Sequence, residues 1–226
     1  MSEAILIFTF GPIQPFIAEA RRTADLYTGS QLLVRLSKAA AQELSTAGDL
    51  VYPASIGQDM PNKIVAKVPW SAANDHAQAA SDALIAQWKS IAADARNKFE
   101  QNGPAVDDAW EQIWNRQVEY PWEIYWAAAS LEGWSSPEQA YKEAYMEADH
   151  AVNSLKRTRK FPPSEEAGLK DTFSGQRQAL RLNNQDAKAY WAGVSNLRDV
   201  SASKLRPEGR ERLDTVALIK RFSPLN

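Results

Sequence analysis

The residues best suited to bind a ligand stand where an apolar run ends and a helical pattern begins. The run from Ile5 to Phe10 predicts a buried strand, and Gly11-Pro12 ends it. Glycine gives the backbone freedom for a tight turn, and proline suits the first position of a helix. A strand that turns sharply into a helix leaves free backbone N–H groups at the end of the sheet, where phosphates are often bound. Gly11, Pro12, Ile13 and Gln14 are therefore candidate nucleotide contacts, and a turn that only packs the first helix is the alternative.

Four further polar residues extend this candidate nucleotide site. Arg21 can contact a phosphate, although it also has Asp25 at the i,i+4 spacing of an ordinary surface pair. Ser30 belongs to Thr28-Gly29-Ser30, which offers a second backbone-rich contact or is a helix kink where Thr28 or Ser30 caps a second helix. Asn62 and Lys63 start a predicted strand, where they either reach a triphosphate or form a solvated strand edge.

Catalysis by a pair of metal ions requires several carboxylates, and these segments lack them. Two Mg²⁺ ions at a phosphoryl-transfer site are held by acids, usually at the end of a first strand and in a neighbouring hairpin. Here the first strand ends Phe8-Thr9-Phe10-Gly11, and the hairpin region offers only Asp59. The sequence therefore predicts no catalytic residue and no metal site.

Composition limits the other kinds of site. The 226 residues contain no cysteine, which excludes thiolate metal sites and a cysteine nucleophile. The two histidines, His76 and His150, are far apart in the sequence, so a histidine-based metal cluster is not expected. A formal net charge of -2 provides no global basic field, so any contact with nucleic acid has to be local.

One local basic cluster follows a predicted helix, at Lys156, Arg157, Arg159 and Lys160. It either contacts RNA or a neighbouring subunit, or it is a solvated helix end whose charges complement the helix dipole. No apolar run approaches the ~20 residues that cross a bilayer. The start Met1-Ser2-Glu3 does not resemble a secretory signal. We therefore expect no membrane contact and a cytoplasmic location.

Periodic patterns place these residues on a mixed set of helices and strands. One helical face runs from Ile13 to Tyr27, and a second helix is expected after an interruption at 28–30. Further strands are predicted at 50–52, 63–68 and 122–129, with helices between the last two. The order strand, helix, strand, strand, helix, strand predicts an α+β fold, a ferredoxin-like βαββαβ palm domain with helical insertions. In that fold two helices cover one face of a four-stranded antiparallel sheet.

The chain is expected to divide near residue 130. Residues 1–130 are predicted to form a degenerate palm domain, and residues 131–226 a C-terminal helical extension. The extension is predicted to contain a helix over 137–159, a looser segment with turns at Gly168 and Gly175, and a last helix that starts near Pro207.

From Gly11 onward the sequence follows the pattern Gly-Pro-[Ile/Val]-Gln-x-Phe-Ile-x-x-Ala-Arg-x-Thr-x-Asp-Leu-[Trp/Tyr]-x-Gly-Ser-x-Leu-Leu. This pattern resembles the large signature subunit of type III CRISPR–Cas effector complexes, and its Cmr-type (III-B) branch looks closest. The segments 60–64 and 122–126 are similar to that family's step into the third strand and to its aromatic fourth strand. The resemblance covers essentially the whole chain.

Residues 168–180 resemble a degenerate form of that family's zinc knuckle. The segment from Lys170 to Arg177 stands in the place of the form Lys-Cys-x-x-Cys-Gly-x-Arg, with Asp171 and Ser174 at the cysteine positions. A serine hydroxyl is a poor zinc ligand, and one aspartate cannot hold the metal alone. We expect the turn to be kept and no zinc to be bound.

The resemblance implies a subunit with two palm domains that face each other and make cyclic oligoadenylates from ATP when the complex binds target RNA. The second palm of the family carries a Gly-Gly-Asp-Asp hairpin that holds the metals, and this sequence contains none. The resemblance therefore predicts a non-catalytic palm-like domain that is not an enzyme on its own.

Such a domain would act in antiviral defence as a scaffold and as half of a composite ATP-binding site, with Mg²⁺ held by another domain. The partners that the resemblance implies are the catalytic palm domain of the same subunit, other type III effector subunits, and guide or target RNA indirectly. The alternative is a degenerate palm that binds RNA or protein without nucleotide.

Overall fold

The computed structural model describes residues 2–119, 122–158, 166–197, 200 and 205–224, and it forms two compact units. The first unit consists of Met1–Ile13, Leu32–Trp88 and Trp122–Phe161, and the second of Gln14–Gln31, Lys89–Pro121 and Pro162–Asn226. Each unit is therefore built from three separate segments of the chain. The predicted domain boundary near residue 130 stays a prediction.

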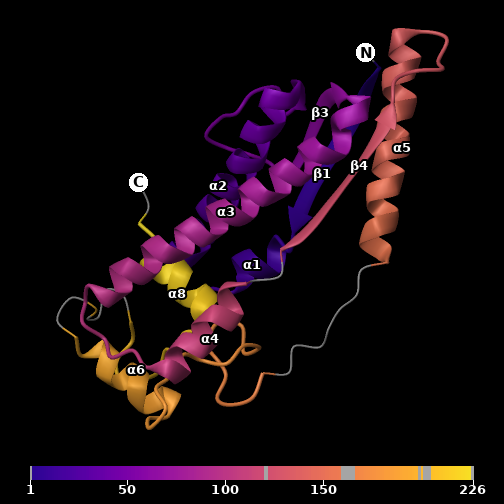
Figure 1. Ribbon diagram of the computed structural model, residues 1–226. Coiled ribbons are helices and arrows are strands. Elements are labelled where there is room, and N and C mark those ends of the chain that lie inside the picture. The colour runs from indigo at the N-terminus through magenta and orange to yellow at the C-terminus, as the bar shows by residue number, and fades with distance from the viewer. Residues whose placement is uncertain (1, 120–121, 159–165, 198–199, 201–204, 225–226) are drawn as a thin grey trace. The chain divides into compact units, whose positions relative to one another are not determined.

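A four-stranded antiparallel sheet is the centre of the first unit (Figure 1). Its strands are β1 (Glu3–Gly11), β2 (Asp49–Tyr52), β3 (Lys63–Pro69) and β4 (Glu123–Ser130), in the order β2-β3-β1-β4. From Ala4 to Phe10 every residue of β1 is at most 2% exposed. This burial on both faces explains why β1 reads as a continuous apolar run and not as an alternating one. The predicted strands and the ferredoxin-like α+β fold are confirmed.

Helices α2 (Thr23–Ala47) and α3 (Ala73–Glu100) contribute to one face of this sheet. A short 3-10 helix, η1 (Trp70–Ala72), leads into α3. Side chains of a strand alternate between its two faces, so Phe10 shares this face with Leu6 and Phe8. Trp122 packs edge-on against Phe10 and against Trp88 of α3, with ring centroids 6.0 and 5.3 Å apart. These contacts place α3 on the even-numbered face of β1.

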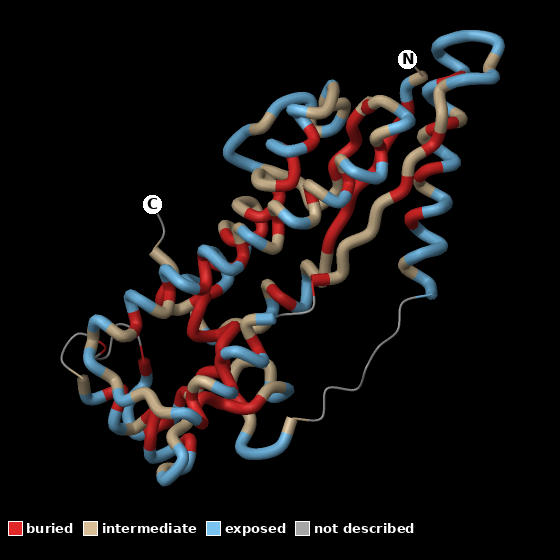
Figure 2. The backbone as a smooth tube through the Cα atoms, in the orientation of Figure 1, coloured by how far each residue is buried: buried red, intermediate tan, exposed pale blue. Residues whose placement is uncertain are grey.

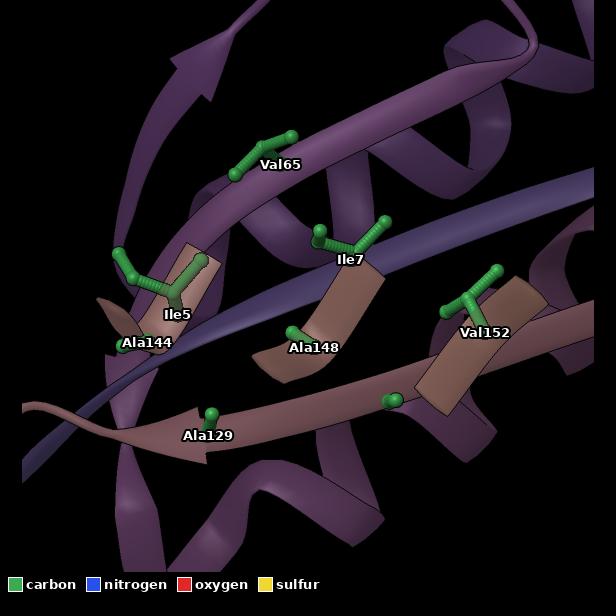
Figure 3. Close-up of a cluster of buried hydrophobic side chains, with 8 residues drawn as sticks. Ile5, Ile7, Val65, Ala129, Ala144, Ala148 and Val152 are labelled. Carbon is green, nitrogen blue, oxygen red and sulfur yellow. The ribbon is translucent and has the colours of Figure 1, made fainter. Parts of the chain in front are cut away.

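Helix α5 (Pro137–Arg157) covers the opposite face of the sheet. Figure 3 shows Ala144, Ala148 and Val152 of α5 against Ile5 and Ile7 of β1. The same cluster includes three residues of the neighbouring strands, namely Val65, Ala127 and Ala129. Alanines on both sides of the contact let the helix approach the strands closely, and one side of α5 is buried while the other is exposed (Figure 2). The sequence predicts this helix but not its place on the sheet.

The second unit is helical and has an aromatic core. It contains α1 (Gln14–Ala18), α4 (Asp108–Val118), α6 (Ala187–Ser195) and α8 (Thr215–Phe222). Phe99 contacts the rings of Trp110, Trp191 and Phe222 at centroid distances of 6.1, 6.0 and 5.1 Å. Three of these helices begin with an aspartate whose carboxylate accepts backbone N–H groups of the first turn, which stabilises the helix start; the residues are Asp107, Asp186 and Asp214.

Two helix boundaries differ from the prediction. The first helix ends at Ala18, and α2 begins at Thr23 and continues through Thr28-Gly29-Ser30 without interruption. The cause is Asp25, whose Oδ2 accepts hydrogen bonds from the backbone N–H groups of Arg21 and Arg22 at 3.0 Å each, as an acid in the first turn of a helix does. The last helix begins at Thr215, and 207–210 form a turn instead of its first residues.

Candidate functional site

One end of the sheet gathers five of the eight predicted nucleotide contacts. In the antiparallel register Thr9 lies opposite Lys63, and Gly11 lies opposite Glu123. The end of β1 is therefore beside the starts of β3 and β4. Gly11-Pro12 is a cis peptide bond and is only partly buried. Gly11, Pro12, Ile13, Asn62 and Lys63 all belong to this strand-end site.

Asn62 fixes the two strands to each other at this end. Its amide Nδ2 donates to the carbonyl of Phe10 at 3.0 Å, and its own carbonyl accepts from the Phe10 N–H at 3.3 Å. The hydroxyl of Ser37, from α2, donates to the carbonyl of the preceding residue Pro61. Asn62 thus positions the end of β1 against the start of β3 at the strand-end site.

Lys63 is directed toward α5 and is engaged in an ion pair. Its Nζ lies 2.6 Å from Oδ1 of Asp149 and 2.9 Å from the hydroxyl of Tyr145. Partial burial opposes the charge, but the hydrogen bonds to Asp149 and Tyr145 outweigh it and raise the pKa of Lys63. Both members of the pair are about a third exposed, at 33% and 30%, so the Lys63 ammonium is paired and still in contact with solvent. A phosphate at Lys63 would have to compete with Asp149.

The described part of the basic cluster lies near the same end of the sheet. Burial and the positive charge of Lys63 lower the pKa of Lys156, while the carboxylates of Asp149 and Glu123 oppose that shift. Arg157 is exposed in the last turn of α5. Arg159 and Lys160 lie outside the described residues.

Acidic side chains at the strand-end site do not form a metal-binding set. Thr9 and Phe10 end β1 without a carboxylate, and Asp59 in the β2–β3 loop is exposed. Among the residues that the structure describes, no group of three His, Asp or Glu side chains is placed to hold a metal ion. A ligand at this end of the sheet could contact main-chain polar groups, the Asn62 amide, Lys63 and Lys156.

The remaining predicted contacts belong to the second unit. Gln14 is exposed at the start of α1, and Ser30 is exposed in the middle of α2. Arg21 is exposed, and its Nε donates to the carbonyl of Thr172. The predicted surface pair of Arg21 with Asp25 is wrong, because Asp25 is 1% exposed and its carboxylate pairs with the Arg221 guanidinium.

Two buried charge clusters hold the second unit together, and sequence reasoning missed both. Arg221 contacts Asp25 and Glu211, and Glu211 also pairs with Arg22 at 3.1 Å. Although burial opposes ionisation, the Arg221 guanidinium lowers the pKa of Asp25 and of Glu211. The partners are separated by 196 and 189 positions in the sequence, so no local pattern could have revealed them.

The second charge cluster joins α1 to α8. Arg177 pairs with Glu19 and with Asp214, and these carboxylates raise the pKa of Arg177 although burial opposes it. Lys220 is 2% exposed and donates to the backbone carbonyls of Phe16 and Glu19. Burial lowers the pKa of Lys220 to about 8. Arg177 and Lys220 are thus engaged in contacts that stabilise the fold.

The knuckle-like turn is kept by hydrogen bonds. Asp171, which is 3% exposed, accepts from the N–H groups of Phe173 and Ser174 at 2.7 Å each. The Ser174 hydroxyl donates to the second Asp171 oxygen at 2.7 Å and accepts from the Gln176 N–H at 3.0 Å. A pairing of Lys170 with Gln178 closes the turn. Asp171 and Ser174, at the cysteine positions, are therefore hydrogen-bonded to each other.

Comparison with known proteins finds a family model and solved structures that are similar to this chain. Residues 5–60 match the family described as CRISPR-associated protein Cmr2, N-terminal. The fold resembles a chain in the cryo-EM structure of the Type III-B Cmr-beta apo state, with a TM-score of 0.70 at 13% identity. It also resembles a chain of Type III-B Cmr-beta bound to cognate target RNA, with a TM-score of 0.61 at 13% identity. Comparison with curated proteins finds no match.

The structural matches cover 97% of this chain but only 31% and 32% of the matched chains, so the chain spans about a third of their length. The described residues form a ferredoxin-like fold, and residues 5–60 are similar to the N-terminal region of Cmr2. These similarities agree with the resemblance to the Cmr-type signature subunit that the sequence predicts. No helix of the described residues is long and apolar enough to cross a membrane.

Proposed function

We propose that this chain is a non-catalytic palm-like domain that serves as scaffold and as half of a composite ATP-binding site. The catalytic palm domain of the same subunit would supply the other half and hold Mg²⁺. The product would be cyclic oligoadenylate, made in antiviral defence in the cytoplasm. Guide and target RNA would act on this domain indirectly, through other subunits of the effector complex.

The observation that carries this proposal is the chemistry of the strand-end site. A turn at Gly11-Pro12 and the amide of Asn62 lie together where β1 ends, and no carboxylate ends that strand. Backbone groups and an amide bind the phosphates or the base of a nucleotide without supplying metal ligands. Because α5 covers one face of the sheet and α3 contributes to the other, ligand contact is confined to the strand ends.

Calorimetric titration of ATP into the whole subunit tests the proposal. Gln14→Ala should weaken ATP binding while leaving the melting temperature unchanged, because Gln14 is exposed. Gln78→Ala is a matched control on α3, where the amide donates to the exposed Asp82 at 2.9 Å. Equal ATP affinity in the wild type and in variants of Gln14 and Lys63 would remove this domain from the ATP site. Turnover of ATP by the 226-residue chain alone with Mg²⁺ would contradict the non-catalytic assignment.

The alternative is a degenerate palm that binds RNA or protein without nucleotide. The exposed Arg157 and the partly buried Lys156 at the end of α5 favour it. Replacing Lys156, Arg157, Arg159 and Lys160 by glutamine distinguishes the two functions. Loss of RNA or subunit binding with unchanged ATP affinity supports the alternative, whereas loss of neither rejects it.

A further inference from the structure

A hollow lined by arginines lies within the second unit, beside the buried charge cluster of Arg221, Asp25 and Glu211. It has a volume of about 160 Å³, and its lining consists of Arg21, Thr172, Arg206, Arg210 and Glu211. All five residues belong to the second unit, so the hollow does not depend on the placement of the two units. We call it the arginine pocket.

A tight turn brings two of these arginines together. The Arg210 N–H donates to the carbonyl of Pro207 at 3.2 Å, and Glu208 and Gly209 have φ values of 61° and 65°. Two successive positive φ values define a type I′ turn, in which glycine is favoured. A side chain at Gly209 would also meet the Lys188 carbonyl, since a Cβ there would lie 2.3 Å from that oxygen. The turn thus places Arg206 and Arg210 on its two sides.

Glu211 anchors the turn and does not neutralise the pocket. Its carboxylate accepts from the Arg206 N–H at 2.8 Å, and its charge is matched by Arg22 and Arg221 at 3.1 and 3.2 Å. It is 3% exposed and therefore sits below the surface that a ligand meets. The positive charge of the arginine pocket remains in excess.

The guanidinium groups of the pocket have donors to spare. Arg21 is oriented by its Nε, which donates to the Thr172 carbonyl, and among the described residues its terminal nitrogens have no partner. The Arg206 guanidinium likewise makes no hydrogen bond within the described part of the chain. Arg210 makes an exposed pair with Glu208, with side chains 70% and 71% exposed, and such pairs contribute little. Arginine presents its N–H groups as a fork that matches the oxygens of a phosphate.

We propose that the arginine pocket binds one phosphate group of a single-stranded polynucleotide. The hollow is small for a whole nucleotide, and its lining contains no aromatic ring on which a base could stack. A phosphate within a polynucleotide strand needs neither the larger volume nor an aromatic ring, because the bases of the strand lie outside the pocket. The proposal stands on the pocket alone and does not rest on the proposed ATP site, although Arg21 is a candidate for both.

Fluorescence anisotropy with a labelled single-stranded oligoribonucleotide and the 226-residue chain tests the proposal. Arg206→Ala/Arg210→Ala should weaken RNA binding about tenfold, since hydrogen bonds to charged groups contribute about 1.5 kcal/mol or more. It should also reduce the slope of log affinity against log salt by about 0.7 for the one phosphate. Arg206→Lys/Arg210→Lys keeps the charge and should restore binding in part, because lysine lacks the fork.

The control variant Lys98→Ala/Lys142→Ala removes the same charge from exposed positions outside the pocket. A loss of RNA affinity as large in the control as in Arg206→Ala/Arg210→Ala would overturn the proposal, since the effect would then be one of net charge. Unchanged RNA binding in the arginine variant would also overturn it. The ATP affinity of the same variant is measured as a second test. If Arg206→Ala/Arg210→Ala loses ATP binding and keeps RNA binding, the pocket binds a free nucleotide, and the proposed contact with a polynucleotide strand is wrong. Gln14→Ala, which tests the ATP site, should leave the RNA affinity unchanged.

Discussion

The carboxylate of Asp25 and the guanidinium of Arg221 form a two-point ion pair. Oδ1 lies 2.7 Å from Nε, and Oδ2 lies 2.8 Å from Nη2. Both side chains are almost fully buried, at 2% and 5% exposed. The pair joins the start of α2 to α8, so that one carboxylate both caps a helix and connects distant segments.

Replacing Asp25 by alanine should destabilise the protein severely. The Arg221 charge would stay buried after losing the Asp25 carboxylate, and removing one partner of a buried pair costs about 3–5 kcal/mol. Urea unfolding measures the loss. Asp94→Ala, at an exposed position of α3, should change stability by less than about 0.5 kcal/mol. A similar effect of the two substitutions would show that the buried pair contributes nothing net.

Lys220 should give the protein a characteristic alkaline pH dependence. Burial lowers its pKa from 10.5 in the unfolded chain to about 8 in the folded one. Between these values the unfolded chain holds a proton that the folded protein has released, so this residue makes stability rise with pH from about 8 to 10.5. Below pH 8 both states are protonated and the dependence from this residue ends.

Melting temperatures of the wild type and of Lys220→Met, followed from pH 7 to pH 10, isolate this contribution. Other lysines and tyrosines titrate in both proteins, so the difference between the two curves is the quantity to read. The wild type should gain on the variant as the pH rises. Parallel curves would mean that Lys220 titrates normally. The variant should be less stable at neutral pH, because the carbonyls of Phe16 and Glu19 lose their donor.

The turn at 168–180 should be independent of zinc and dependent on Asp171. Its carboxylate accepts from two N–H groups and from the Ser174 hydroxyl, so treatment with a chelator should leave the melting temperature unchanged. Asp171→Ala should cost about 2 kcal/mol or more, because several hydrogen bonds to a charged acceptor are lost together. Ser174→Ala removes only part of this set and should cost less. A drop in melting temperature on chelation would contradict the prediction.

Patterns in the sequence predicted the sheet well because its signals are local. The apolar run of β1, the alternation of β3 and the aromatic start of β4 each describe a strand by itself, and their order allows few topologies. The inner position of β1 in the sheet agrees with its apolar run, since β1 is buried from Ala4 to Phe10.

What the sequence failed to predict depends on distant partners. Asp25 was expected at the surface, but it is buried because it pairs with Arg221, almost at the other end of the chain. An amphipathic helix such as α5 shows that one side is buried but not against what, so its alanines did not reveal that it covers the sheet. The partner of Lys63 was missed for the same reason.

Whether Lys63 binds nucleotide can be decided through its ion pair with Asp149. Asp149→Asn keeps the shape of the side chain and removes the charge that holds Lys63, so a phosphate would no longer have to compete for the ammonium group. If Lys63 belongs to the ATP site, Asp149→Asn should tighten ATP binding by up to about fivefold, since partly exposed pairs contribute up to about 1 kcal/mol.

Lys63→Ala should weaken ATP binding, and the double variant should behave like Lys63→Ala because the two residues act on one contact. Asp82→Asn, which alters an exposed acceptor on α3, is the matched control and should leave the ATP affinity unchanged. Equal ATP affinities in all four variants would make the Lys63–Asp149 pair a contact between β3 and α5 and nothing more.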